Sequence, residues 1–345
     1  MIKYILIIIT LNILIQSCGD TVTNENTLDS EVPSNVTTGE ELLPDSSGNG
    51  FFEIQSGTIS FIIHATSSTS STPNFISLRD PNKNDYSEFY YGTNGYSGFF
   101  VPYSKNYPLK PGIWSYRILN YNELKIKKRI NPLSNLSSIK VQPYISGSDN
   151  ISLALNIMKN IYSTNGINLD VEDTETLESK YSQVSYNFNN STTPEMVSKG
   201  DEDKVNLFFI TDYTDAAYLG NAAGIPGSQG LKGSHNGVLI NLSAHKTGGS
   251  LNNQLLGETA GHEMGHFLGL FHPSESAGTL FDPIADTPQC PLSQNSNNDS
   301  KLTAEECGQQ YGADNLMFWD SWENGNQDNL TEGQVYVLKR ALIAK

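Results

Sequence analysis

The sequence predicts an α+β protein in which a small all-β sandwich precedes a larger domain, built from a twisted mixed sheet and helices. Residues 51–134 carry short runs of β-branched and aromatic residues between turn dipeptides, without a long segment of period 3.6. From residue 137 onward, strand-like runs alternate with segments whose apolar residues recur at helical spacing. A chain of 345 residues is long enough to bury two cores of this kind.

The first 50 residues are predicted to lie outside both domains. Lys3 precedes an apolar run, residues 4–15, that is too short to span a bilayer. The run ends in ILIQSC, which resembles a bacterial lipobox and implies that residues 1–17 are a lipoprotein signal peptide and that Cys18 is lipidated. An ordinary signal peptide with an incidental cysteine is the alternative. Residues 18–50 are polar and are predicted to form a flexible tether.

The first domain, residues 51–134, is predicted to consist of strands and turns. Its strand-like runs are residues 57–65, 97–103, 113–119 and 124–130. Turn signals that include Pro-Gly and Asn-Gly occur in this region, which favours a small sandwich. His64 lies on a predicted strand, and we expect it to be a core or rim histidine.

The second domain, residues 137–345, is predicted to start with a strand at residues 139–145 and a helix that ends near Gly166. The apolar face of that helix consists of Ile151, Leu155, Met158 and Tyr162. Further strands are expected at residues 167–171, 205–210 and 238–242. The polar, glycine-rich stretch from Gly220 to Gly237 is predicted to be a long loop.

A last helix is predicted near the end of the chain. Thr331 and Gln334 form a plausible capping box at its start. Val335, Leu338 and Leu342 give it an apolar stripe, which indicates packing against the core.

The string HEMGHFLGLFH, residues 262–272, predicts a catalytic zinc site. His262 and His266 are four residues apart and therefore lie on one face of a helix, a turn apart. Gly269 can adopt the left-handed conformation that ends a helix and turns the chain back, which would bring His272 in as a third ligand. Three protein ligands leave the open position of a catalytic zinc. Glu263 is placed to hold a water beside the metal.

The same helix carries a row of glycines. Gly257, Gly261, Gly265 and Gly269 recur every fourth residue and form a ridge without side chains. A glycine inside a helix costs about 0.5–1 kcal/mol relative to alanine, so this ridge requires a structural reason. We expect another backbone segment to approach it closely.

The pattern HExxHxxGxxH resembles that of the metzincin metalloproteases. In that family a methionine lies on a tight turn beneath the metal, and Met317 in DNLMFW matches it. The segment FDPIADTPQC is similar to the D-x-x-x-D-T-P segment of the pappalysin branch. Over residues 137–345 the resemblance implies zinc bound by His262, His266 and His272, Glu263 as catalytic base and Met317 as turn methionine. Trp319 stands where pappalysins often have a tyrosine, and an indole cannot ligate zinc.

The segment after the third histidine offers hard oxygen ligands. Asp282, Asp286 and Thr287 lie close together in sequence and suit calcium, and the pappalysin resemblance supports such a site. The alternative is a turn in which these side chains bind backbone amides.

The cysteine count is consistent with export. With Cys18 assigned to lipid, Cys290 and Cys307 remain as an even pair, for which a disulfide is the simplest interpretation. Zinc binding by these two cysteines is the alternative, but they lack C-x-x-C spacing.

The net charge of −16 argues against nucleic acid as a partner. The expected partners are a protein or peptide substrate and, through the lipid on Cys18, the membrane. His235 and His245 stand in no ligand spacing and are predicted to be loop histidines.

The metzincin resemblance implies a zinc endopeptidase that hydrolyses internal peptide bonds. The lipobox resemblance implies that it is exported and lipid-anchored to the bacterial cell envelope, periplasmic or surface-facing. A zinc hydrolase with an acidic third ligand is one alternative, with Asp286, Glu305 or Glu306 as candidates. A cell-envelope binding lipoprotein or adhesin with a vestigial or secondary protease site is another, although Glu263 is retained.

Overall fold

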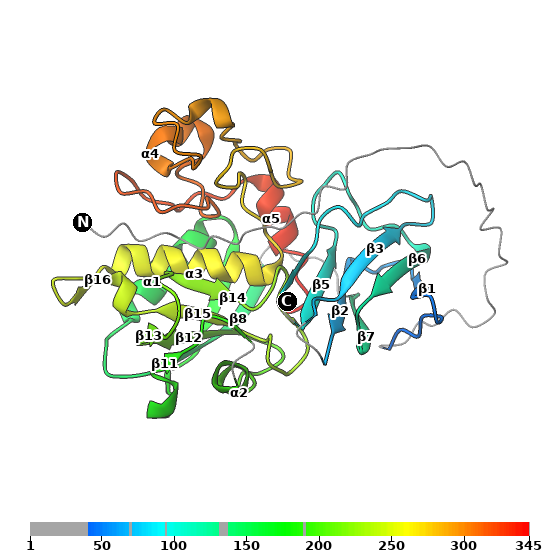
Figure 1. Cartoon of the computed structure of the whole chain (residues 1–345), viewed down its shortest axis with the longest axis horizontal. Helices are drawn as coiled ribbons and strands as arrows, with labels where there is room; N and C mark the ends of the chain where they lie inside the picture. The colour runs from blue at the N-terminus through cyan, green and yellow to red at the C-terminus, as the bar shows by residue number, and fades with distance from the viewer. Residues whose placement is uncertain (1–40, 69–70, 94, 131–136, 189–190, 345) are drawn as a thin grey trace.

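The computed structural model describes residues 41–68, 71–93, 95–130, 137–188 and 191–344, and Figure 1 shows the N-terminal sheets beside the helix-containing part. The expected signal peptide, Cys18 and most of the expected tether lie outside the described residues. Within the described ranges, no helix is both long and apolar enough to cross a membrane.

Two antiparallel sheets make up the N-terminal part. The first has the order β1-β6-β3, with β1 at Asn49–Ile54, β3 at Asn74–Arg79 and β6 at Gly112–Leu119. The second has the order β4-β5-β2-β7, with β2 at Ser60–Thr66, β4 at Tyr91–Thr93, β5 at Tyr96–Val101 and β7 at Glu123–Arg129. The four predicted strands are confirmed as β2, β5, β6 and β7, whereas β1, β3 and β4 were not predicted.

The two N-terminal sheets share one core. Phe61 of β2 makes edge-to-face contacts with Phe52 of β1 and Trp114 of β6, at centroid distances of 5.2 Å each. All three rings are fully buried. His64, on β2, is also buried, as its strand position predicted.

Packing against the N-terminal core begins before residue 50. Leu42 is buried in the N-terminal core, and its amide donates to the carbonyl of Leu124 on β7 at 2.9 Å. Strand β1 then starts at Asn49. A single buried leucine in a polar stretch produces no periodicity from which its burial could be inferred from the sequence.

The second sheet system has the order β10-β8-β12-β15-β14, and β9 also pairs with β8. All these pairings are parallel except that of β14 with β15. The bounds are Ser137–Ile145 for β8, Ile167–Val171 for β9, Glu175–Thr176 for β10, Val205–Ile210 for β12, Gly220–Ala222 for β14 and Val238–Asn241 for β15. The predicted strands at 139–145, 167–171, 205–210 and 238–242 are confirmed.

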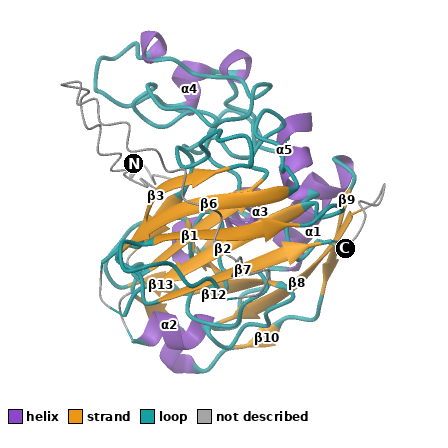
Figure 2. Ribbon diagram, turned by 90° about the vertical axis from the view of Figure 1, so that its right-hand side faces the viewer, coloured by secondary structure: helices purple, strands orange, loops and turns teal. Residues whose placement is uncertain are grey.

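Helices α1, Ser152–Thr164, and α3, Asn253–Leu268, cover one face of this sheet, and the short helix α2, Thr192–Val197, packs on the other. Helix α1 packs against α3, and α3 also contacts β12, β14 and β15. Alternation along β12 directs Leu207 and Phe209 toward α1 and α3, while Phe208 and Ile210 pack on the opposite side with residues of α2. Figure 2 shows the strands of both parts from the side of the N-terminal sheets.

The remaining elements are short. They are η1 at Ser179–Tyr181, β11 at Gln183–Val184, β13 at Asp212–Tyr213, η2 at Ser243–His245, β16 at Lys246–Thr247, β17 at Ser250–Leu251, η3 at Leu292–Gln294, α4 at Ala304–Cys307, η4 at Gln309–Tyr311 and α5 at Glu332–Leu338. The capping box predicted for α5 is confirmed: Thr331 accepts from the amide of Gln334, whose side chain binds the amide of Thr331.

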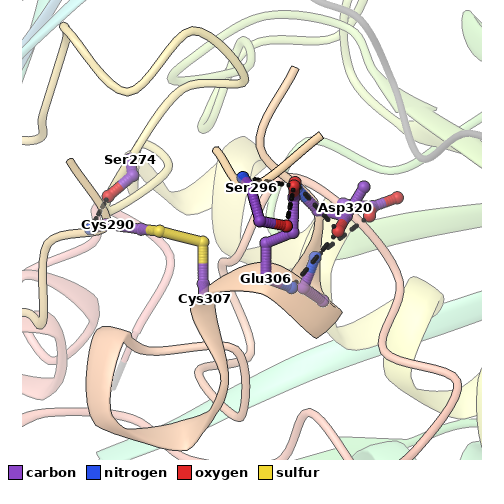
Figure 3. The surroundings of a disulfide bond; sticks show 8 residues. Ser274, Cys290, Ser296, Glu306, Cys307 and Asp320 are labelled. Carbon is purple, nitrogen blue, oxygen red and sulfur yellow. Dashed lines mark hydrogen bonds between the residues drawn. A yellow bond between two sulfur atoms is a disulfide. The ribbon is translucent and has the colours of Figure 1, made fainter. Parts of the chain in front are cut away.

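The lobe between α3 and α5 is held by the predicted disulfide. Cys290 and Cys307 are bridged, with a Cα–Cα distance of 5.8 Å. Figure 3 shows the bridge beside Ser274, whose hydroxyl accepts from the amide of Cys290 at 2.7 Å. Both sulfur-bearing residues are buried with Leu302 and Trp319 in a small core of their own. The bridge therefore crosslinks two segments, 17 residues apart in sequence, that share this small core.

The two parts of the molecule are packed together. Ile62 and Phe100 of the N-terminal sheets belong to the core formed by α1 and α3. The guanidinium of Arg129, at the end of β7, donates to the carbonyls of Lys339 and Ala341 at 2.7 and 2.9 Å. This contact ties the N-terminal sheets to the end of the chain.

Candidate zinc site

Helix α3 has well-defined ends that position its histidines. At its start, the side chain of Asn252 accepts from the amide of Leu255 at 3.2 Å. At its end, Gly269 adopts φ +109, the left-handed conformation predicted for it. The chain then turns back, so that His272 lies against the helix.

The three histidines converge as predicted. The Nε2 atom of His272 lies 3.0 Å from Nε2 of His266 and 3.2 Å from Nε2 of His262. All three side chains are buried, and their ligand atoms lie within 4.8 Å of one another. Among the described residues, this is the one group of three or more histidine, cysteine, aspartate or glutamate side chains that could hold a metal.

The other ring nitrogen of each histidine has a partner that fixes the tautomer. The Nδ1 atoms lie near oxygens that accept: the carbonyl of Leu316 at 2.7 Å for His262, the carbonyl of Leu270 at 2.8 Å for His266, and the carboxylate of Glu275 at 3.1 Å for His272. Each Nδ1 therefore carries the proton, and each Nε2 presents a lone pair.

This arrangement fits zinc. A tetrahedral zinc with Zn–N bonds of about 2.0–2.1 Å separates its nitrogen ligands by about 3.3 Å, close to the 3.2 and 3.0 Å that separate Nε2 of His272 from those of His262 and His266. Burial lowers the pKa of His262 to about 3 and that of His266 well below its usual value. Burial therefore favours the neutral, ligating form of these two rings, and the three Nε2 atoms that face one another offer their lone pairs to a shared cation.

Glu263 lies beside the triad. Its side chain is fully buried, and neither carboxylate oxygen has a hydrogen bond of ordinary geometry to the described residues, although the backbone amide of Ala222 on β14 lies near enough to oppose part of the effect of burial on its pKa. Burial raises the pKa of this carboxyl well above its usual value. A Cβ on Gly220 of β14 would lie 2.6 Å from Cγ of Glu263, so only glycine permits this approach. The carboxylate is therefore held against the edge strand β14.

The glycine ridge of α3 is explained by close packing. A Cβ on Gly257 would lie 2.7 Å from the carbonyl oxygen of Ala154 on α1, and one on Gly265 would lie 2.4 Å from Sδ of Met317. The carbonyl of Gly261 accepts from the hydroxyl of Tyr162 on α1 at 2.8 Å. The expected approach of another backbone segment is confirmed at Gly257.

Met317 packs against the zinc helix α3, and its role as the turn methionine stays a prediction. It is fully buried, contacts Gly265, and follows Leu316, whose carbonyl holds His262. Trp319, two residues later, packs instead in the core of the disulfide lobe with Cys290 and Cys307. The side chain of Trp319 therefore contributes to the core around the disulfide.

The expected calcium ligands have partners within the chain. Asp282 accepts from the hydroxyl of Thr287 at 2.7 Å and from the amide of Ile284 at 3.2 Å. Asp286 accepts from the hydroxyl of Thr331 and the amide of Gly333 at 2.9 Å each, at the start of α5. These contacts match the turn alternative, and calcium at this place stays a prediction.

The remaining histidines lie away from the triad. His235 is in a loop, as predicted, and its ring stacks on Tyr96 at a centroid distance of 4.7 Å. The loop prediction for His245 was wrong, because this residue is buried in η2. Its Nδ1 lies 2.6 Å from the carbonyl oxygen of Asn241, and its Nε2 lies 2.9 Å from the hydroxyl of Thr259 on α3.

Two features of the site were missed by the sequence reasoning. Glu275 was not recognised as the partner of His272, although it follows that histidine by three residues. The edge strand β14 was assigned to a loop, because a strand of three residues with a glycine at its start gives no alternating pattern. The strand β14 depends on β15, a segment that meets it only in the folded protein.

No family model matches this chain. Two extracellular metalloproteases of Colletotrichum graminicola are similar to part of it, at 39% identity over 94 residues and 38% over 109 residues. These alignments cover 26% and 28% of this chain and 32% and 38% of those proteins. The chain therefore spans about a third of the length of the curated relatives it matches.

Solved structures show a limited likeness. An archaemetzincin from Methanopyrus kandleri is 14% identical with a TM-score of 0.28, covering 39% of this chain and 76% of that one. Myroilysin is 15% identical with a TM-score of 0.26, covering 58% and 78%. Scores of this size add nothing to what the site shows. The residues of HExxHxxGxxH themselves assemble three converging, buried histidines that could hold one zinc ion.

Proposed function

We propose that this protein is a secreted zinc endopeptidase that hydrolyses internal peptide bonds of proteins. The observation that carries the proposal is the pairing of three buried, converging Nε2 lone pairs with a buried carboxylate, Glu263, that has no hydrogen bond of ordinary geometry to the described residues. The names of the two matched relatives support the same activity and an extracellular location.

Different residues of the chain would hold the metal ligands in place and transfer the proton. When bound, zinc supplies a Lewis acid that polarises the scissile carbonyl and acidifies water. Glu263 takes a proton from the attacking water and passes it to the nitrogen of the leaving amine. The carbonyls of Leu316 and Leu270 and the carboxylate of Glu275 keep the three imidazoles in the ligating tautomer and orientation.

The edge strand β14 supplies a place for the substrate main chain. It forms the end of its sheet, pairs with β15 on one side, and pairs with no strand on the other side within the described ranges. An extended peptide can add to such an edge through main-chain hydrogen bonds. Gly220 of this strand contacts Glu263, so a peptide on β14 would lie beside the base.

Three finer features belong to the same proposal. The segment FDPIADTPQC supports the pappalysin branch of metzincins. The string ILIQSC supports a lipid anchor at Cys18, which a Cys18→Ala variant tests, since it should no longer fractionate with membranes. The contacts between Phe61 and the facing rings of Phe52 and Trp114 support a β-sandwich for residues 51–134.

The test is digestion of a diverse peptide library by the purified protein, followed by sequencing of the products. Glu263→Gln should keep zinc and fold but lose more than nine-tenths of the turnover, because it removes the base and no ligand. Glu258→Gln is the matched control, because Glu258 is buried on the same helix and binds Gln254 and Gln327 instead. Wild-type protein that holds zinc and cleaves no peptide would favour the binding lipoprotein.

A further inference from the structure

The N-terminal sheets reach the edge of the catalytic sheet. Strand β4 begins at Tyr91, which forms an antiparallel bridge with Ile225, three residues after the end of β14. The contact continues on β5, where the hydroxyl of Tyr96 donates to the carbonyl of Pro226 at 3.3 Å. A Cβ on Gly98 would lie 2.6 Å from that same carbonyl oxygen. The chain that follows β14 is therefore held by main-chain contact with the N-terminal sheets.

A group of tyrosines lies beside this contact. The rings of Tyr186 and Tyr218 are 4.6 Å apart between centroids. The side chain of Asn221, in the middle of β14, donates to the carbonyl of Tyr186 at 3.1 Å. These tyrosines are thus fixed to the strand that we propose binds the substrate main chain.

Both Tyr91 and Tyr186 are tied to the edge strand or to the chain just after it. Tyr91 bridges Ile225, three residues after β14, and the carbonyl of Tyr186 accepts from Asn221 within β14. The electrostatics agree with this placement: burial raises the pKa of Tyr186, with smaller contributions from Tyr91 and Tyr218, and burial raises the pKa of Tyr91 to about 12, with a contribution from Glu275. Gly220, at the start of the same strand, contacts Glu263. Tyr91 and Tyr186 therefore lie along the strand that also approaches the base.

The three tyrosines are only partly buried. Tyr91, Tyr186 and Tyr218 each retain some exposed surface, whereas Tyr213, whose ring meets that of Tyr186 edge-on, is buried. Aromatic faces that stay partly exposed next to a reacting centre can cover a large apolar side chain. The carboxylates of Glu275 and Asp215 nearby disfavour an acidic one.

We propose that Tyr91 of the N-terminal sheets forms one wall of the substrate cleft and, with Tyr186 and Tyr218, makes a subsite for a bulky apolar side chain of the peptide. This inference rests on the proposed endopeptidase function. It assigns the N-terminal sheets a part in substrate selection.

The first experiment compares pairs of peptides. Library cleavage by the wild type identifies the substrate position where a large apolar residue is preferred, and matched peptides then carry Phe or Ala there. In Tyr91→Ala, the ratio of kcat/KM for the Phe peptide over the Ala peptide should fall about fivefold, as expected for the loss of one aromatic contact. Tyr91→Phe should keep the ratio. Tyr121→Ala is the control, since this half-buried tyrosine adjoins Asp45 and Tyr116 in the N-terminal part.

A second experiment does not depend on turnover. Photo-crosslinking from a benzoylphenylalanine introduced at position 91, in the Glu263→Gln background, should capture the Phe peptide, and the same probe at position 121 should not. A ratio within twofold of wild type in Tyr91→Ala, or equal capture from both positions, would overturn the subsite. Wild-type protein that cleaves nothing would refute the endopeptidase instead, and crosslinking would still decide whether Tyr91 lies in a peptide-binding cleft.

Discussion

Glu275 is the one partner of the triad that mutation can remove, because the other two imidazoles are held by main-chain carbonyls. Its carboxylate accepts from Nδ1 of His272 at 3.1 Å, and its side chain is 21% exposed. Removal of a partner that orients a metal-binding histidine typically weakens metal binding about 10- to 100-fold. We therefore expect Glu275→Ala to weaken zinc binding by about 1.4–2.7 kcal/mol.

The assay is competition for zinc with a chelator of known affinity. Glu275→Gln should lose less, because its amide oxygen can still accept from Nδ1. Glu305→Ala serves as control, because this exposed glutamate on α4 accepts from the amide of Glu323 away from the triad. An affinity in Glu275→Ala within twofold of wild type, with an unchanged thermal midpoint, would show that His272 does not depend on this carboxylate for its orientation.

Three further predictions concern packing, the disulfide and pH. Gly257→Ala should destabilise the protein by about 1–2 kcal/mol in denaturant unfolding, since its Cβ would meet a carbonyl of α1, whereas Gly261→Ala, whose Cβ has ordinary contacts, should be neutral or stabilising; equal effects would refute the close approach. Replacement of Cys290 and Cys307 by Ala should cost about 3 kcal/mol in the same assay and lower activity, and an unchanged midpoint would exclude a bracing role. Burial lowers the pKa of His245 to about 4, so the folded state binds fewer protons than the unfolded state and stability should be lost as pH falls from 6.5 toward 4. In His245→Gln this loss of stability should be absent. The check is the free energy of unfolding of wild type and variant across this pH range, and identical pH profiles of the two proteins would contradict the prediction.

The zinc site was predictable because its residues are close together in the sequence, at spacings that fix their relative positions. His262, Glu263 and His266 share one helix, and Gly269 ends that helix in the conformation that brings His272 back. Every step from residue to geometry spans at most eleven residues. The same holds for the capping box of α5 and for the alternation along β12.

The parts that were missed depend on contacts between distant segments. Strand β14 is a strand only because β15 pairs with it, and Leu42 is buried only because β7 offers it a place. The position of Tyr91 beside the catalytic part follows from its bridge to Ile225, more than a hundred residues away. No local pattern in the sequence encodes these pairings.

The most direct test of the zinc site is the metal content of purified protein. We predict about one zinc per chain for the wild type and for His235→Ala, whose ring lies away from the triad, and a strongly reduced content for His272→Ala. Wild-type zinc content in His272→Ala, with wild-type activity, would contradict the histidine triad and require an acidic third ligand.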